Sequence, residues 1–215
     1  MHGVKAMDVK HWDERYSERE YAYGSEPNDF LASVADRIPP GPVLTLGEGE
    51  GRNALFLAGL GYEVVAVDQS EVGLAKTRLR ATERGVRIQT QQADLRDYPI
   101  RQGAWAGIIS IFCHLPPSIR VPLHAAVVHG LRPGGLFILE AYTPRQCGRG
   151  TGGPASPELM DSLDDLTVEL AGLECLHARE LEREVREGVY HTGLASVVQL
   201  LARRGSTKSP SLAGQ

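Results

Sequence analysis

One stretch of the sequence decides the fold: Val43-Leu44-Thr45-Leu46-Gly47-Glu48-Gly49-Glu50-Gly51-Arg52-Asn53. The first four residues form a short, mostly apolar run that is typical of a buried strand, and the residues after Gly51 begin a helical pattern. Glycines at alternate positions permit a sharp turn and let a ligand approach the backbone closely. Strand, glycine-rich turn and helix together predict an open α/β sheet that binds a ligand at the carboxyl ends of its strands.

Strands and helices alternate on both sides of this stretch. Further strands are expected over 63–67, 86–91, 105–112 and 136–142, and helices over 27–37, 52–60, 71–84 and 118–131. Ser25 is a plausible cap for the helix over 27–37. The segment before it, from His11 to Gly24, is aromatic and charged without strong periodicity. Apolar strands separated by helices indicate a parallel sheet covered on both faces.

The last third of the chain follows a different pattern. A Gly- and Pro-rich loop over 148–157 precedes a helix over 157–170, and strands over 173–185 and 192–202 are joined through Glu187-Gly188. The fold class is therefore α/β: a doubly wound, mostly parallel, seven-stranded, Rossmann-like sheet with a C-terminal antiparallel hairpin. We expect a single domain over 1–204 and a disordered polar tail over 205–215.

Composition limits the class of partner. The 215 residues carry a net charge of −4, with charges of both signs interspersed and no basic face, which disfavours nucleic acid and an anionic membrane surface. No apolar run approaches the roughly 20 residues of a membrane span, and Met1 to Lys10 lacks the apolar stretch of a secretory signal. The three cysteines are far apart and form neither a disulfide framework nor a metal site, so no metal and a cytoplasmic location are expected.

The charge of the loop discriminates between cofactors. A dinucleotide fingerprint requires Gly-x-Gly-x-x-Gly, whereas here the third glycine is Gly51 and position 52 is Arg. Glu48 and Glu50 would repel a pyrophosphate at short range. S-adenosylmethionine instead carries a sulfonium and an ammonium, which two carboxylates can accommodate. Asp68, at the end of the second strand, can accept hydrogen bonds from ribose hydroxyls.

The motifs resemble those of class I S-adenosylmethionine-dependent methyltransferases. The resemblance rests on the glycine-rich stretch, followed by Val64-Val65-Ala66-Val67-Asp68, Gln92-Ala93-Asp94-Leu95 and Leu131-Arg132-Pro133-Gly134-Gly135. Gly51-Arg52-Asn53 and Asp68-Gln69-Ser70 are similar to the tellurite-resistance methyltransferases. The opening Trp12-Asp13-Glu14-Arg15-Tyr16 resembles the corresponding segment of thiopurine and thiol methyltransferases. The match covers roughly residues 12 to 203.

The resemblance implies a role for each matching residue. S-adenosylmethionine, which leaves as S-adenosylhomocysteine, would be held as follows: the methionine portion by Gly47, Gly49 and Gly51, the ribose by Asp68, the adenosine edge by Gln69, the adenine by Ala93, Asp94 and Leu95, and the sulfonium by Phe112 and Cys113. Trp12 and Tyr16 would close over the site as part of an N-terminal lid segment, 1–26.

Two positions depart from the family pattern. The strand carries Thr45 where an acidic residue is common, and Glu48 replaces a small residue after the first loop glycine. Glu48 would then take over the contact with the cofactor's ammonium; the alternative is a degraded loop that binds weakly. Glu50 is expected to be solvated, and Asp68 could simply cap a helix, although Ser70 can do so instead.

The acceptor pocket is expected between Cys113-His114 and Glu140-Ala141-Tyr142, with His114 and Tyr142 as candidate catalytic residues and Glu140 as a further candidate base. Residues 12–27 should cover the pocket, and the loop over 148–154 should form a second flap. Tyr190 and His191 could be surface or acceptor pocket. The favoured function is methyl transfer to a small molecule such as a thiol or other chalcogen compound, by a monomer or weak dimer. The alternatives are a protein methyltransferase and a non-catalytic S-adenosylmethionine sensor.

Overall fold

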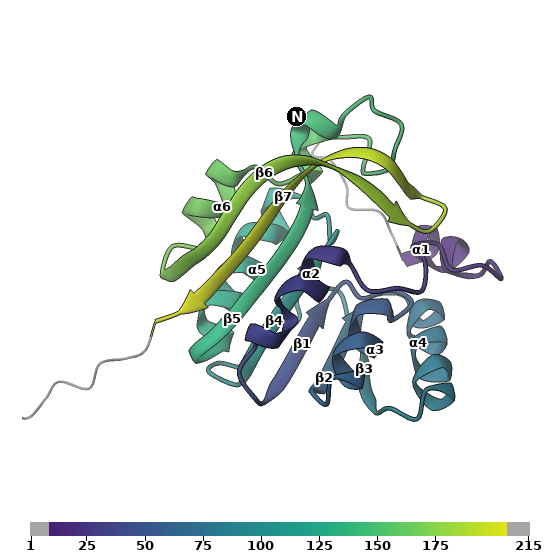
Figure 1. Cartoon of the computed structure of the whole chain (residues 1–215), viewed down its shortest axis with the longest axis horizontal. Helices are drawn as coiled ribbons and strands as arrows, with labels where there is room; N and C mark the ends of the chain where they lie inside the picture. Colours follow the sequence, from purple (N-terminus) through teal and green to yellow (C-terminus); the bar gives the residue numbers. More distant parts are fainter. Residues whose placement is uncertain (1–8, 206–215) are drawn as a thin grey trace, which may run out of the picture.

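A computed structural model describes residues 9–205 (Figure 1). Seven strands run along the chain: β1 (Pro42–Leu46), β2 (Glu63–Asp68), β3 (Ile88–Gln92), β4 (Trp105–Ile111), β5 (Leu131–Tyr142), β6 (Leu173–Glu187) and β7 (His191–Arg204). The α-helices are α1 (Val9–Tyr16), α2 (Asp29–Val34), α3 (Arg52–Gly59), α4 (Glu71–Glu83), α5 (Pro117–Gly130) and α6 (Leu163–Glu169). Short 3-10 turns lie at η1 (Ala35–Arg37), η2 (Pro144–Gln146) and η3 (Pro157–Leu159).

The strands form one sheet in the order β3-β2-β1-β4-β5-β7-β6. The pairs from β3 to β5 are parallel, whereas β7 is antiparallel to both β5 and β6. The mostly parallel, seven-stranded sheet with a C-terminal antiparallel hairpin is therefore confirmed. The strand order changes direction at β1 and β4, which is where ligands bind in sheets of this kind.

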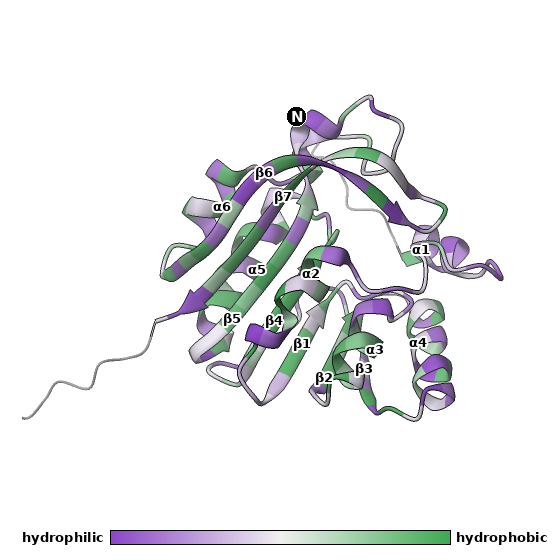
Figure 2. Ribbon diagram, in the orientation of Figure 1, coloured by the Kyte–Doolittle hydropathy of each residue, from purple (hydrophilic) through white to green (hydrophobic). Residues whose placement is uncertain are grey.

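Apolar residues fill both faces of the sheet because alternate strand residues point to opposite sides. Leu44 and Leu46 of β1 pack with residues of α5 and α6, whereas Val43 packs with residues of α2 and α3 on the other face. Figure 2 shows the hydrophobic strands lying between these helices. This core fixes the strand ends on which the site is built.

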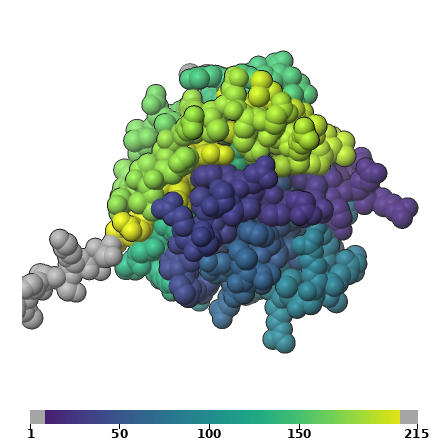
Figure 3. All heavy atoms as spheres, in the orientation of Figure 1, coloured from purple at the N-terminus to yellow at the C-terminus, as the bar shows by residue number. Residues whose placement is uncertain are grey.

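Two segments distant in sequence meet above the carboxyl ends of the strands. The N–H groups of Val189 and Tyr190, in the turn between β6 and β7, donate to the carbonyl of Ala22 at 3.0 and 3.3 Å. A Cβ on Gly24 would stand 3.1 Å from the nitrogen of Gly188. In Figure 3 the N-terminal segment lies as a band between the β6–β7 hairpin and the helices α3 and α4.

Residues 9–16, for which the sequence shows no strong periodicity, form α1, whose Tyr16 ring lies against Gly73 of α4. Two local predictions were wrong. The cap of α2 is Asn28 rather than Ser25: its side chain accepts the N–H of Leu31. The helix expected over 157–170 is divided into η3 and α6, and Ser162 caps α6. The expected tail, apart from Gly205, lies outside the described residues.

No helix between residues 9 and 205 has the length and apolar character needed to cross a membrane.

Candidate active site

A cavity of about 640 Å³ lies at the carboxyl ends of β1, β2 and β4, within the usual size range of small-molecule sites. Its lining comes from the glycine-rich loop, the segments after β2, β3 and β4, helix α1, the β6–β7 turn and the loop at 152–154. All the predicted cofactor residues line it except Gly49 and Gly51. Of the two candidate catalytic residues, His114 lines the cavity and Tyr142 does not.

The glycines of the loop have different tasks. Gly47 lines the cavity with φ at +62°, and a Cβ there would stand 2.6 Å from the Cys113 sulfur. Gly49 lies beneath Tyr16, whose hydroxyl would be 2.6 Å from an added Cβ. Gly51 packs against Thr77 of α4, and a Cβ added to Gly51 would stand 2.5 Å from the Thr77 hydroxyl oxygen. Only Gly47 therefore faces the ligand space, while Gly49 and Gly51 allow the loop to pack tightly.

Asp68 holds the loop in shape and also lines the cavity. Its Oδ2 accepts the N–H of Gly49 at 2.8 Å, and its Oδ1 accepts the N–H of Ser70 at 2.8 Å. Burial raises the pKa of Asp68 to about 6, although these backbone donors oppose the shift. A carboxylate has about four lone-pair sites, so Asp68 can still accept hydrogen bonds from a ribose. The cap of α4 is Ser70, whose Oγ accepts the N–H of Gly73 at 3.1 Å.

Glu48 lines the cavity and caps helix α3. Its Oε1 accepts the N–H groups of Asn53 at 3.0 Å and Ala54 at 2.9 Å. Burial raises the pKa of Glu48 to about 7, although the donor from Ala54 lowers it. The family's usual acidic position, Thr45, is buried and does not line the cavity.

The expectation that Glu50 is solvated was wrong. Its side chain is 4% exposed. One oxygen accepts the N–H of Ala22 at 2.8 Å, and the other pairs with the ammonium of Lys76 at 2.7 Å. Because these partners lie 28 and 26 residues away in sequence, Glu50 joins the glycine-rich loop to the N-terminal segment and to α4.

The expected adenine side is more open to solvent. Asp94 is exposed, and its carboxylate binds the backbone N–H and the guanidinium of Arg96. Leu95 is buried, whereas Gln69 and Ala93 are half-buried. The backbone N–H of Ala93 donates to the carbonyl of Asp68 at 2.9 Å, which ties this segment to the end of β2.

Aromatic rings form the opposite wall. Phe112 lies 4.6 Å from Tyr142 and 4.7 Å from His191, measured between ring centroids, and His114 stacks on Tyr142 at 5.5 Å. Phe112 adopts φ of +50°, in the left-handed region, which costs a non-glycine residue about 1–3 kcal/mol and tends to occur at functional sites. Burial raises the pKa of the Cys113 thiol well above its usual range, so the thiol stays protonated.

Three buried polar atoms on this wall have no hydrogen-bond partner within residues 9–205: His114 Nε2, Tyr142 Oη and His191 Nδ1. His114 Nδ1 lies 3.2 Å from the carbonyl of Leu159, so this nitrogen carries the proton and Nε2 is an acceptor. Burial lowers the pKa of His114 to about 4 and that of His191 well below its ordinary value. Both imidazoles are therefore neutral at pH 7.

The roof is built from α1 and the chain that follows it. Trp12 stacks on Tyr16 with 5.7 Å between ring centroids. Arg15 donates to the Tyr23 hydroxyl at 2.7 Å, and its guanidinium lies 4.4 Å from the centre of the Tyr190 ring. Sequence reasoning identified Trp12 and Tyr16, left Tyr190 and His191 open, and missed Arg15 and Tyr23. The spacing of Trp12, Arg15 and Tyr16 on one helical face was the available signal.

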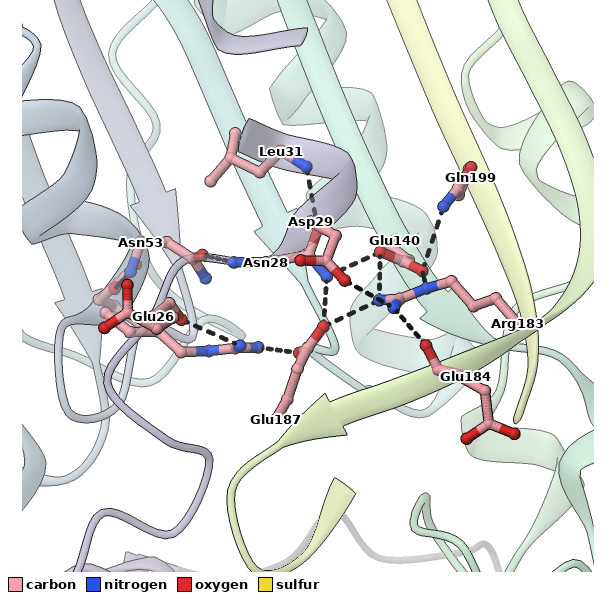
Figure 4. Close-up of polar contacts among 12 residues, drawn as sticks. Glu26, Asn28, Asp29, Leu31, Asn53, Glu140, Arg183, Glu184, Glu187 and Gln199 are labelled. Carbon is pink, nitrogen blue, oxygen red and sulfur yellow. Dashed lines mark hydrogen bonds and ion pairs between the residues drawn. The ribbon is translucent and has the colours of Figure 1, made fainter. Parts of the chain in front are cut away.

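The proposal of Glu140 as a base was wrong. Glu140 is fully buried and does not line the cavity. Its oxygens accept hydrogen bonds from Asn28 at 2.7 Å, from Arg183 at 2.6 and 3.1 Å and from Gln199 at 3.3 Å (Figure 4). A carboxylate committed to a cation and two amides inside the protein is a structural group with no route to a substrate.

These residues fit S-adenosylmethionine. Its positively charged methionine portion would meet Glu48 beside Gly47, and its ribose would meet Asp68. A Cβ on Gly47 would clash with the sulfur of Cys113, so only glycine keeps this part of the loop in place. The loop places carboxylates where a dinucleotide would bring phosphates, which disfavours that ligand.

Several known proteins are similar to this chain in sequence. Residues 43–135 match the family described as "Methyltransferase domain". The chain is 27% identical to a 2-heptyl-1-hydroxyquinolin-4(1H)-one methyltransferase of Mycobacteroides abscessus, over 66% of this chain and 65% of that protein. It is 29% identical to the uncharacterized methyltransferase YodH of Bacillus subtilis, over 69% of this chain and 60% of that protein. The chain thus spans about 60 to 65% of the length of these two curated relatives.

A similar fold occurs in a solved structure. TehB from Haemophilus influenzae superimposes with a TM-score of 0.70 and 20% sequence identity, over 91% of this chain and 66% of that chain. At this identity the likeness concerns the fold. Together with the family match and the glycine-rich loop, it leads to one conclusion. Residues 43–135 carry an S-adenosylmethionine-dependent methyltransferase domain, and the fold around them is that of the class I enzymes.

Proposed function

We propose that the protein transfers the methyl group of S-adenosylmethionine to a small molecule bound against the aromatic wall. The observation that carries this proposal is a single cavity that extends from Gly47 and Asp68 to Phe112, His114 and His191. When bound, the cofactor supplies the electrophilic methyl group. The roof from Trp12 to Gly24 and the loop at 152–154 cover part of the cavity and leave a confined space, which suits a small molecule better than a protein side chain.

The main contribution of the chain is positioning. Holding an acceptor in line with the methyl carbon and sulfur can lower the barrier by about 7–11 kcal/mol. The roof excludes water, which would otherwise compete as acceptor. His114 is a poor general base at pH 7 because its pKa is about 4. Its Nε2 can instead orient an acceptor by accepting a hydrogen bond.

This arrangement favours an acceptor that needs little help to lose its proton. A thiol or other chalcogen nucleophile meets that requirement and agrees with the resemblance to tellurite and thiol methyltransferases. The rings of Phe112, His114 and His191 further suit a planar compound. The Mycobacteroides abscessus relative, named for a hydroxyquinolone, is consistent with a small planar acceptor.

The proposal is tested by incubating the protein with S-adenosylmethionine and one acceptor at a time: an alkyl thiol, an aromatic thiol, a hydroxyquinoline, selenite or tellurite. We expect S-adenosylhomocysteine to form with at least one of them. His114→Ala should lower turnover by less than the 10²–10⁴-fold that is typical of removing a general base. Cofactor binding without transfer to any small acceptor would contradict the proposal and favour a sensor, whereas transfer only to a protein would favour a protein methyltransferase.

A further inference from the structure

The glycine-rich loop is bonded to both segments that roof the cavity. Glu50 of the loop accepts the N–H of Ala22, whose carbonyl accepts the N–H groups of Val189 and Tyr190 in the β6–β7 turn. Arg52, the residue after the loop, forms an ion pair with Glu187 at the end of β6, at 2.5 Å. The loop, the N-terminal segment and the hairpin turn therefore form a closed circuit of hydrogen bonds and ion pairs.

Glu187 is the most heavily bonded member of this circuit. Its side chain is 5% exposed. One oxygen pairs with Arg52, and the other accepts the amide of Asn28 at 2.9 Å and the guanidinium of Arg183 at 2.8 Å. Figure 4 shows Glu187 at the end of its strand, joined to Asn28 and to Arg183. Its carboxylate thus connects the end of β6 to Arg52, the first residue of α3.

The same junction is reinforced by Asn53. Its Oδ1 accepts the backbone N–H of Asn28 at 2.9 Å. Asn28 in turn donates its side-chain amide to Glu187 and Glu140. Arg52 and Asn53, which follow the glycine-rich loop, are therefore both connected to Glu187. Arg52 binds it directly, and Asn53 is connected to it through Asn28. Separating the loop from the hairpin would leave buried charges unpaired, so the two should move together.

We propose that Glu187 is a positioning residue that transmits cofactor binding from the glycine-rich loop to the β6–β7 turn, and so places Tyr190 and His191 for the acceptor. The inference rests on the proposed function. Tyr190 and His191 follow Glu187 by three and four residues and line the cavity, so a shift of Glu187 moves the acceptor wall. Cofactor binding at the glycine-rich loop would then order this circuit of hydrogen bonds and ion pairs, and so position the acceptor wall before the acceptor enters.

A purely structural brace would give the same static contacts, so the test follows a response to ligand. Amide hydrogen exchange is measured on the full chain with and without S-adenosylhomocysteine, which cannot donate a methyl group. The variants are Glu187→Gln, which keeps the shape and removes the charge, and Arg52→Gln, which removes the partner. The matched control is Glu174→Gln: Glu174 is 53% exposed on the same strand and pairs with Arg203 at 2.7 Å.

In the wild type we expect ligand to slow exchange by about fivefold or more at 47–54 and also at 188–191. Glu187→Gln and Arg52→Gln should keep the slowing at 47–54 and lose it at 188–191, whereas Glu174→Gln should keep both. Equal slowing at 188–191 in all variants, or none there in the wild type, would overturn the inference. If one variant does not fold, comparison of the wild type with the other variant still shows whether the response at 188–191 depends on this ion pair. Absence of slowing at 47–54 in the wild type would instead refute cofactor binding, and with it both proposals.

Discussion

Gly73 of α4 lies directly against the carbonyl group of Gly49: a Cβ on Gly73 would stand 2.9 Å from the Gly49 oxygen and 3.0 Å from its carbon. Gly73 has no side chain because the glycine-rich loop passes where one would be. The ring of Tyr16 lies at 3.0 Å from the same point. One helical glycine therefore sets how closely the loop and the lid approach α4.

Gly73→Ala should weaken S-adenosylmethionine binding by about tenfold or more, because the loop backbone must shift to admit the new methyl group. Gly59→Ala is the matched control: Gly59 is also helical and has no atom within 4 Å of its added Cβ, so alanine should leave binding unchanged and raise stability slightly. Calorimetric titration gives both affinities. Equal affinities for the two variants would show that the loop tolerates the displacement.

Glu50→Gln should release the N-terminal segment. The change removes the ion pair with Lys76 and weakens the bond to the N–H of Ala22. A hydrogen bond to a charged group contributes about 1.5–3 kcal/mol, so cleavage of residues before Ser25 by limited proteolysis should accelerate. Glu71→Gln serves as control: Glu71 is an exposed glutamate of α4, the helix that carries Lys76, and it pairs with Arg78. Unchanged proteolysis of Glu50→Gln would mean that the stacked aromatic rings alone hold the segment.

Much of the fold could be predicted from the sequence. The apolar strands, the glycine-rich turn and the terminal hairpin are local patterns, and the strands begin and end within about two residues of the expected bounds, except that β5 begins at Leu131 rather than at Leu136. The partners of buried charges are not local. Glu140 and Arg183 are 43 residues apart, and Glu50 and Ala22 are 28 apart. Nothing in the adjacent sequence distinguishes such a buried glutamate from a solvated or catalytic one.

Tertiary packing also decided the local errors. Helix α1 has a mostly polar sequence and packs on α4, where the ring of Tyr16 lies against Gly73. Asn28 rather than Ser25 caps α2 through its side-chain oxygen, and its amide nitrogen also donates to Glu140 and Glu187, which are distant in sequence. His191 sits beside Phe112 and Tyr142 only after β7 pairs with β5. The neighbours of such residues can be predicted only when the order and pairing of the strands are known.

Cofactor binding should depend on pH through Glu48. Its pKa is about 7, and the cofactor's ammonium favours the ionised carboxylate. Affinity should therefore be highest between about pH 7 and 8, where Glu48 is ionised and the ammonium is still charged, and fall by up to about tenfold per unit below pH 7. In Glu48→Gln the affinity should be lower above pH 7, and its decline should begin near pH 6, where Asp68 with a pKa of about 6 takes up a proton. A decline that still begins at pH 7 in Glu48→Gln would exclude this role.

Gly152→Ala should disturb the acceptor wall. A Cβ there would stand 2.7 Å from the Tyr142 hydroxyl and 2.9 Å from a carbon of His191, and φ is +118°. Gly148→Ala is the control, since it has φ of +80° with nothing within 4 Å of the added Cβ. We expect Gly152→Ala to raise KM for the acceptor and leave cofactor affinity unchanged, with little effect from Gly148→Ala. A change in cofactor affinity without a change in KM for the acceptor would indicate that the loop at 152–154 contacts the cofactor rather than the acceptor.

The most direct measurement is calorimetric titration of the purified protein with S-adenosylmethionine, S-adenosylhomocysteine and NAD. The account predicts saturable binding of the first two ligands and none of NAD, because Glu48 and Asp68 favour positive charge beside Gly47. Asp68→Ala, if folded, should lose about 1.5–3 kcal/mol of binding free energy with the charged hydrogen bonds to the ribose. Tight binding of NAD, or no binding of S-adenosylmethionine by the folded wild type, would contradict the account.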